Sequence, residues 1–129
     1  MKTLNELRDE IHENAKNKGF WDSPRETGTL LMLCVSELAE AMEADRVGKH
    51  SYTTGIDELI KAGYTCDDSP VSYKSYFELD VKDTFEDELA DTIIRILDLC
   101  GAKGIDIEKH IELKIKYNAT RERMHGKKY

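Results

Sequence analysis

The chain has 129 residues, of which 40% are hydrophobic and 35% charged, and its formal net charge is −7. This length fits one domain with a core of its own, and the hydrophobic share is too high for a disordered chain. The net negative charge argues against a general binder of nucleic-acid polymers or membrane surfaces. We therefore expect a single globular domain spanning residues 1–129.

The cysteines and the apolar segments indicate the cellular compartment in which we expect the protein. Cys34, Cys66 and Cys100 are an odd number and lack zinc-binding spacing, which fits a reducing compartment. The first ten residues lack the apolar core of a signal peptide, and no uninterrupted apolar run approaches membrane-spanning length. These features predict a cytoplasmic protein with no membrane partner.

The first two helices are predicted from their start signals. Thr3 and Glu6 form a capping box at the start of the first helix. The second is expected to begin at Ser23, with Pro24 in its first turn, and to end at Gly48. The apolar stripe of this second helix is formed by Leu31, Val35, Leu38 and Met42. Both segments therefore read as amphipathic helices.

Two further helices are predicted in the second half of the chain. One starts near Asp83 or Thr84 and ends near Gly104, and the other opens at Asp106 and frays after Arg121. The apolar positions of the third helix are Leu89, Ile93, Ile96 and Cys100, and those of the fourth are Ile107, Ile111 and Ile115. Both sets recur at helical spacing.

The segment 49–82 has a different character and is predicted to be an insertion between helices two and three. A short helix is expected near residues 56–62. Phe77, Leu79 and Val81 alternate with polar residues, which indicates a strand or small hairpin before helix three. The predicted fold is therefore all-α and resembles a four-helix bundle, with a short irregular or hairpin insertion.

Helix two carries three glutamates without compensating bases. Glu37, Glu40 and Glu43 follow one another at intervals of three, and no Lys or Arg lies three or four residues from Glu37 or Glu40. Like charges at this spacing destabilise a helix by roughly 0.2–0.5 kcal/mol per pair. Glu37 also has apolar helical neighbours, so its charge is costly unless something outside the helix compensates it.

Helix three repeats this spacing with Glu88 and Asp91. Each has an alternative structural explanation: Glu88 lies in a first turn, where the helix dipole favours acids, and Asp91 has Arg95 four residues on. If helices two and three pack antiparallel, four carboxylates converge with a charge of about −4. Oxygen ligands of this kind favour Mg²⁺, with Mn²⁺ as a substitute, and a solvated acidic surface is the competing interpretation.

The last helix and the single tryptophan provide candidate substrate contacts. Lys114, Asn118 and Arg121 form one polar stripe, which Lys127 continues into the tail. Such a stripe suits polyphosphate oxygens, although it is also what the solvent side of an amphipathic helix looks like. Trp21 is either a hydrophobic staple before helix two or a platform for a base or ribose.

Three motifs together resemble those of the MazG-like nucleotide pyrophosphohydrolases, in the all-α NTP pyrophosphatase superfamily. SELAE at 36–40 is similar to the family's EExxE, and ELAD at 88–91 matches its ExxD. The run from Lys114 to Arg121 is similar to the family's Lys-x-x-x-Asn-x-x-Arg tail.

The resemblance implies a fold, a cofactor and a reaction. The implied Mg²⁺ ligands are Glu37, Glu40, Glu88 and Asp91, and the implied phosphate contacts are Lys114, Asn118 and Arg121. The implied activity is hydrolysis of a nucleoside triphosphate to the monophosphate and pyrophosphate by metal-activated water. Family members assemble with sites completed by neighbouring subunits, so a homodimer or homotetramer is expected.

One departure from the family pattern leaves alternatives open. Ser36 stands where the motif has its leading glutamate. Glu43 could substitute for that glutamate, or the motif could shift by one turn so that Glu40 and Glu43 do more of the work. The competing functions are a non-catalytic, metal-binding helical interaction module and a pyrophosphatase for another diphosphate-containing substrate.

Overall fold

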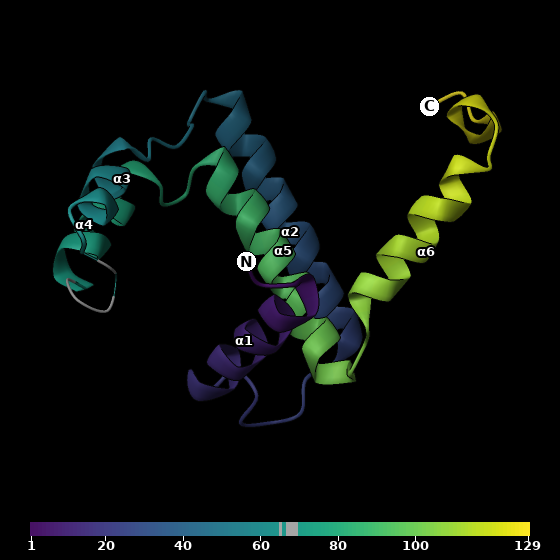
Figure 1. Cartoon of the computed structure of the whole chain (residues 1–129), viewed down its shortest axis with the longest axis horizontal. Helices are drawn as coiled ribbons and strands as arrows, with labels where there is room; N and C mark the ends of the chain where they lie inside the picture. The colour runs from purple at the N-terminus through teal and green to yellow at the C-terminus, as the bar shows by residue number, and fades with distance from the viewer. Residues whose placement is uncertain (65, 67–69) are drawn as a thin grey trace. The chain divides into compact units, whose positions relative to one another are not determined.

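The computed structural model describes residues 1–64, 66 and 70–129, and all regular structure in these residues is helical. In chain order the helices are α1 (Leu4–Asn17), α2 (Thr27–Arg46), α3 (Thr54–Lys61), α4 (Pro70–Asp80), α5 (Phe85–Lys103), α6 (Ile107–Ala119) and the short 3₁₀ helix η1 (Arg123–Gly126) (Figure 1). The all-α prediction is confirmed. None of the helices in the described ranges has the length and apolar character that crossing a membrane requires.

The chain divides into two compact units that are described separately. Unit 1 comprises Met1–Arg25 and Ile96–Tyr129, and unit 2 comprises Glu26–Arg95. Helix α5 contributes its last turns to unit 1 and its first turns to unit 2.

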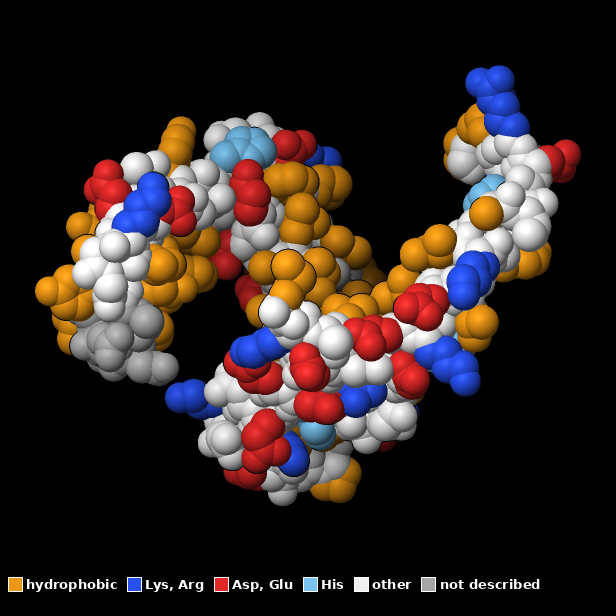
Figure 2. Space-filling model, viewed as in Figure 1, with side chains coloured by type: hydrophobic (Ala, Val, Ile, Leu, Met, Phe, Trp, Pro, Cys, Tyr) orange, Lys and Arg blue, Asp and Glu red, His pale blue; other side chains and the backbone are white. Residues whose placement is uncertain are grey.

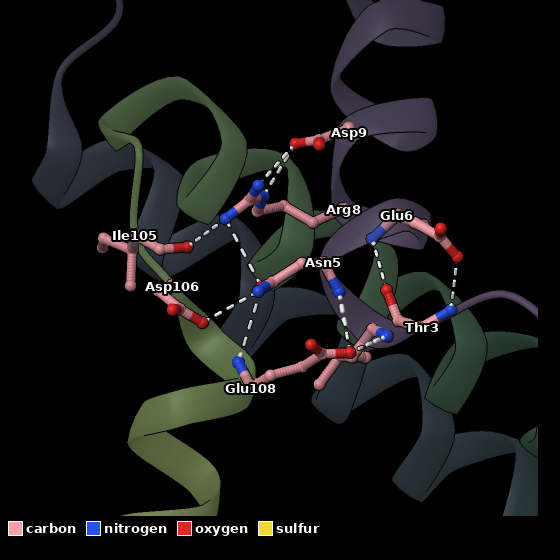
Figure 3. Close-up of polar contacts among 9 residues, drawn as sticks. Thr3, Asn5, Glu6, Arg8, Asp9, Ile105, Asp106 and Glu108 are labelled. Atoms are coloured by element: carbon pink, nitrogen blue, oxygen red, sulfur yellow. Dashed lines mark hydrogen bonds and ion pairs between the residues drawn. The ribbon is translucent and has the colours of Figure 1, made fainter.

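In unit 1 the predicted capping box starts α1. The Thr3 hydroxyl accepts a hydrogen bond from the Glu6 backbone N–H at 3.1 Å, and the Glu6 carboxylate accepts one from the Thr3 N–H at 2.8 Å. These two bonds satisfy amide groups that have no partner inside the helix. Figure 3 shows both bonds at the start of α1.

Polar contacts tie the start of α1 to the start of α6 (Figure 3). The Glu108 carboxylate accepts a hydrogen bond from the Asn5 N–H at 3.2 Å, and the Asn5 amide donates to Asp106 at 2.8 Å. The Arg8 guanidinium donates to the Ile105 carbonyl at 2.6 Å. Asp106 also caps α6, as predicted, by accepting from the Lys109 N–H at 3.1 Å.

Helices α1 and α5 approach closely at Gly101, and this contact can be tested. A Cβ at Gly101 would lie 2.6 Å from the Cβ of His12. We expect Gly101→Ala to destabilise the protein by about 1–3 kcal/mol in urea unfolding, because a rigid helix must shift to make room. Gly28→Ala is the matched control, since nothing lies within 4 Å of its added Cβ. The control should stabilise α2 by about 0.5–1 kcal/mol; equal behaviour of the two variants would contradict the close packing.

In unit 2, α2 lies antiparallel to the first turns of α5 (Figure 1). The Phe85 N–H, at the start of α5, donates to the carbonyl of Lys49, just after α2, at 2.9 Å. The buried side chains of α2 recur at intervals of four and three residues and are Leu30, Cys34, Glu37, Ala41 and Ala44. Glu37 therefore lies in the middle of the buried stripe of α2.

The apolar stripe predicted for α2 does not form the core of this chain. Leu31, Val35, Leu38 and Met42 are each between 48% and 52% exposed. The buried stripe of α2 is instead built mostly from smaller side chains and one glutamate. Figure 2 shows hydrophobic side chains at the surface along this helix pair. In the described part of the chain, the larger apolar side chains are thus left about half exposed.

The predicted start of helix two was also wrong. Helix α2 begins at Thr27, and its N-cap is Glu26, whose side chain makes no capping hydrogen bond. Two residues before the helix, the Arg25 guanidinium lies over the Trp21 ring, 5.2 Å from its centre. The N-cap Glu26 has an extended backbone, with φ of −74° and ψ of 127°, and the helix starts one turn later than the sequence predicts.

The insertion 49–82 forms two helices where a strand or hairpin was predicted at its end. The predicted short helix is confirmed as α3, and residues 70–80 form α4. The partly buried aromatic side chains of α4, Tyr73 and Phe77, lie one helical turn apart, so this segment also carries a helical period. A Cβ on Gly55 would come within 2.7 Å of the Tyr76 ring, so α3 and α4 pack closely. Residues 65 and 67–69 of the insertion lie outside the described residues.

Candidate metal centre

Three of the four predicted ligands come together in unit 2. One carboxylate oxygen each from Glu37, Glu40 and Glu88 lie within 4.8 Å of one another. Glu37 and Glu88 are each 7% exposed, whereas Glu40 faces solvent. Asp91, the fourth predicted ligand, lies one turn further along α5, is half-buried, and does not belong to this group of three. We call Glu37, Glu40 and Glu88 the carboxylate cluster.

The one basic side chain that pairs with the carboxylate cluster in the described part of the chain is Arg95. Its Nε donates to Glu37 Oε1 at 2.5 Å. The sequence placed Arg95 one turn from Asp91 and offered that pair as an explanation for Asp91, but the observed ion pair reaches across to α2 instead. Burial is the largest single influence and raises the pKa of the Glu37 carboxyl, but the hydrogen bonds with Arg95 and Glu40 and the charge of Arg95 together outweigh it, so that this pKa is lowered.

Arg95 pairs with Glu37, and among the described residues Glu88 and Glu40 have no ion-pair partner. Burial, followed by the hydrogen bond with Glu37 and the charge of Glu40, raises the pKa of Glu88 to about 7. The contact with Glu37 also raises the pKa of Glu40. At neutral pH and without a cation, the cluster therefore holds a proton between carboxylates that would each be ionised in water.

Further acids surround the carboxylate cluster. Burial is the main cause that raises the pKa of Asp91, and the charges of Asp87 and Glu37 add to it. The charge of Asp83 also raises the pKa of both Asp91 and Glu40. Asp83 has a left-handed backbone with φ of 59°, and its N–H donates to Asp87 at 2.9 Å. The sequence did not indicate Asp83 as a member of this group of acids, because it lies in the loop before α5 and outside the helical spacing of the other acids.

Three hydroxyl groups near the carboxylate cluster donate hydrogen bonds to backbone carbonyls and not to the carboxylates; they belong to Ser36, Thr84 and Thr92. Thr92 is buried one turn from Glu88, and its hydroxyl donates to the Glu88 backbone carbonyl at 2.9 Å. The Thr84 hydroxyl donates to the Val81 carbonyl at 2.6 Å. Ser36, which stands in the place of the family's leading glutamate, donates to the Leu33 carbonyl at 2.7 Å. Each hydroxyl is used within its own helix or turn.

The carboxylate cluster fits a hard divalent cation in composition and size. Mg²⁺ binds oxygen at about 2.0–2.1 Å, so its ligand oxygens lie about 3–4 Å apart. Oxygens within 4.8 Å reach that spacing by small side-chain rotations. The buried Glu88 carboxylate pairs with no base among the described residues, so a bound cation would offset both its desolvation and its repulsion from Glu37.

Neither of the two auxiliary candidates, Glu43 and Lys127, belongs to the carboxylate cluster. Glu43 is exposed and pairs with Arg46 on its own helix, at 3.8 Å. Lys127 follows η1 in the tail and is exposed. The geometry around Glu43 is that of an ordinary surface ion pair, which contributes at most about 1 kcal/mol.

In unit 1, Trp21 belongs to a half-buried polar cluster. Its indole N–H lies 3.0 Å from Asp98 Oδ1 and 3.1 Å from Asp98 Oδ2. The His12 Nδ1 lies 2.7 Å from Asp98 Oδ1, and the His12 and Trp21 rings meet edge to face at 5.3 Å. The sequence assigned no partner to His12, because Asp98 lies 86 residues away along the chain. Trp21 is thus fixed in position, as either proposed role would require.

The predicted polar stripe of α6 gathers around a tyrosine. Lys114 Nζ lies 5.0 Å from the centre of the Tyr117 ring, and the Arg121 guanidinium lies 5.5 Å from it. Asn118, between them, is half-buried, and its Oδ1 is buried without a hydrogen-bond partner in the described part of the chain. These three residues lie in unit 1 and the carboxylate cluster in unit 2.

Comparison with known proteins does not assign a family. The chain matches no protein-family model, no curated protein and no solved structure.

Proposed function

We propose that the protein is a Mg²⁺-dependent nucleoside triphosphate pyrophosphohydrolase of the MazG-like, four-helix-bundle type. The observation that carries this proposal is the carboxylate cluster, in which the buried Glu88 faces Glu37 and Glu40 with Arg95 as the one paired base in the described residues. A buried group of acids is costly to the fold, and a divalent cation is the partner that offsets this cost.

The chain's own residues would divide the work by their exposure. Glu37 and Glu88 are buried and would hold the ion, whereas Glu40 is exposed and would face the incoming nucleotide. Asp91, one turn beyond Glu88, would complete the ligand set. Mg²⁺ held there would lower the pKa of a bound water and offset charge on the phosphates.

We propose that the basic stripe of α6 contacts phosphate groups, and this role can be tested. We expect Lys114→Ala to raise KM for a nucleoside triphosphate about tenfold, because the exposed ammonium supplies a charge-assisted contact. Steady-state kinetics measure this effect. Lys16→Ala is the control, since Lys16 is a surface residue paired with Glu13 at 2.8 Å. Equal KM values for the two variants would remove Lys114 from the site.

We also propose that the protein is a homo-oligomer. This proposal is supported by the large apolar side chains of α2 that the chain itself leaves about half exposed. Exposed apolar surface on one helix face is typical of surfaces that another protein covers.

A non-catalytic metal-binding module of the same fold is the second candidate. It is favoured by Ser36, whose hydroxyl donates to its own helix and adds no carboxylate to the cluster. Both candidates bind a cation, so hydrolysis distinguishes between them.

Thermal denaturation with and without Mg²⁺ tests the metal site that both candidates share. At [Mg²⁺] a hundred times the dissociation constant, a native-state site adds about 2.7 kcal/mol of stability. We therefore expect a rise in Tm that saturates with Mg²⁺ and is larger than that produced by K⁺ at equal ionic strength. An equal effect of the two salts would refute the metal site.

A further inference from the structure

The ion pair between Arg95 and Glu37 points to a role for Arg95 that its place on α5 alone does not explain. The guanidinium crosses from α5 to a glutamate on α2, and the Glu37 side chain is 9% exposed. Arg95 itself keeps 36% of its side chain exposed. The contact therefore joins a buried acid to a base that has room to move toward solvent.

Arg95 occupies the position of a counter-ion for the carboxylate cluster. The neighbouring hydroxyls of Thr84 and Thr92 donate to backbone carbonyls, and so they do not stabilise the carboxylates. Glu88 lies two turns before Arg95 on α5 and is only 7% exposed. It has no ion pair with a base among the described residues. A cluster with three acids and one base is thus short of positive charge.

We propose that Arg95 is a built-in counter-ion that holds Glu37 when no cation is bound and competes with a divalent cation for the Glu37 carboxylate. This inference rests on the proposed metal site. When the cation binds, Glu37 exchanges the Arg95 N–H for the ion, and the guanidinium turns toward solvent. A planar guanidinium released beside a metal-bound nucleotide is suited to contact phosphate oxygens.

The inference predicts that removing Arg95 affects the cation-free and the cation-bound protein in opposite ways. Arg95→Gln leaves the buried Glu37 without its base, so Tm of the cation-free protein should fall. The same change removes a competitor and a repulsive charge, so Mg²⁺ should bind roughly three- to tenfold more tightly. Arg95→Lys keeps the positive charge and should bind Mg²⁺ nearly as wild type does.

The experiment is isothermal titration calorimetry of the full chain with Mg²⁺. Binding of Mn²⁺ is measured separately, as the decrease in the EPR signal of the free ion. Arg46→Gln is the matched control, because Arg46 pairs with the exposed Glu43 at 3.8 Å on α2 and should leave the affinity unchanged. Tighter binding by Arg95→Gln alone, including binding that appears only in this variant, supports the inference.

The other outcomes separate the inference from the proposed function. If wild type binds Mg²⁺ and Arg95→Gln binds equally or more weakly, the counter-ion role is overturned and the metal site stands. If neither protein binds either cation, the metal site itself is refuted and the counter-ion role falls with it.

Discussion

Replacing Glu88 with glutamine should abolish the Mg²⁺-induced rise in Tm and lower nucleotide hydrolysis about a hundredfold or more. Glu88 is the buried member of the carboxylate cluster that has no base, so it is the residue for which a cation matters most. The amide keeps the size of the side chain but cannot carry the negative charge that a hard cation requires. Mg²⁺ titration by thermal denaturation and a pyrophosphate-release assay measure the two effects.

The same variant should be more stable than wild type when no divalent cation is present. The pKa of Glu88 is raised to about 7, so the folded state binds its proton more tightly than the unfolded chain does. The stability that this proton contributes is complete below pH of about 4.5 and is lost as pH rises through about 7. At pH 8 in EDTA, we therefore expect Glu88→Gln to raise Tm by about 2–5 °C, with a smaller gain at pH 5.

Glu86→Gln is the matched control on the same turn of α5. The pKa of Glu86 is shifted in the opposite direction from that of Glu88, so its effect on Tm should also be opposite. The Ser51 N–H, followed by the backbone N–H of Glu86 itself and the His50 side chain, lowers the pKa of Glu86 to about 2. Its carboxylate therefore stabilises the fold above pH of about 4.5, and this stability is lost as pH falls toward 2. Glu86→Gln should lower Tm at pH 7 and leave the Mg²⁺ response intact. The account would fail if both glutamine variants lost the Mg²⁺ response equally.

Replacing Asp98 with alanine should destabilise unit 1 by about 1–3 kcal/mol, because two half-buried donors lose their acceptor. The carboxylate of Asp98 accepts from the Trp21 indole at 3.0 Å and pairs with His12 at 2.7 Å. Urea unfolding measures the loss. The single tryptophan of the chain also reports it directly, since its fluorescence should shift when the indole N–H loses its partner.

Asp9→Ala is the control for Asp98→Ala. Asp9 pairs with Arg8 at 2.7 Å, but its side chain is 67% exposed, so its removal should change stability by less than about 0.5 kcal/mol. A loss for Asp98→Ala no greater than this would mean that the Trp21 cluster does not stabilise unit 1. Trp21 would then have to be explained by a contact outside the chain.

The sequence predicted those parts of the structure that depend on neighbours along the chain. The capping box at Thr3 and Glu6, the cap at Asp106 and the helical character of the four main segments follow from local hydrogen bonding and periodicity. The convergence of Glu37, Glu40 and Glu88 also followed, because antiparallel packing of two helices brings their one-turn spacings together.

The features that the sequence did not reveal depend on contacts between distant residues. Arg95 lies one turn from Asp91 in the sequence, yet its long side chain reaches Glu37 across the helix pair. The sequence indicates an apolar stripe of large side chains on α2, but the stripe that is buried carries Ala41 and Ala44, since small side chains let helices approach. The alternation at Phe77, Leu79 and Val81 is typical of a strand, but residues 70–80 form α4, which packs closely against α3.

The central claim is that the carboxylate cluster supports hydrolysis of a nucleoside triphosphate at its α-phosphorus. The most direct measurement is product analysis for a panel of ribo- and deoxyribonucleoside triphosphates with Mg²⁺, for wild type and Glu88→Gln. We predict monophosphate and pyrophosphate in equal amounts from wild type, neither product in EDTA, and about a hundredfold less from the variant. Diphosphate with inorganic phosphate, or no Mg²⁺-dependent product from any nucleotide, would contradict the claim.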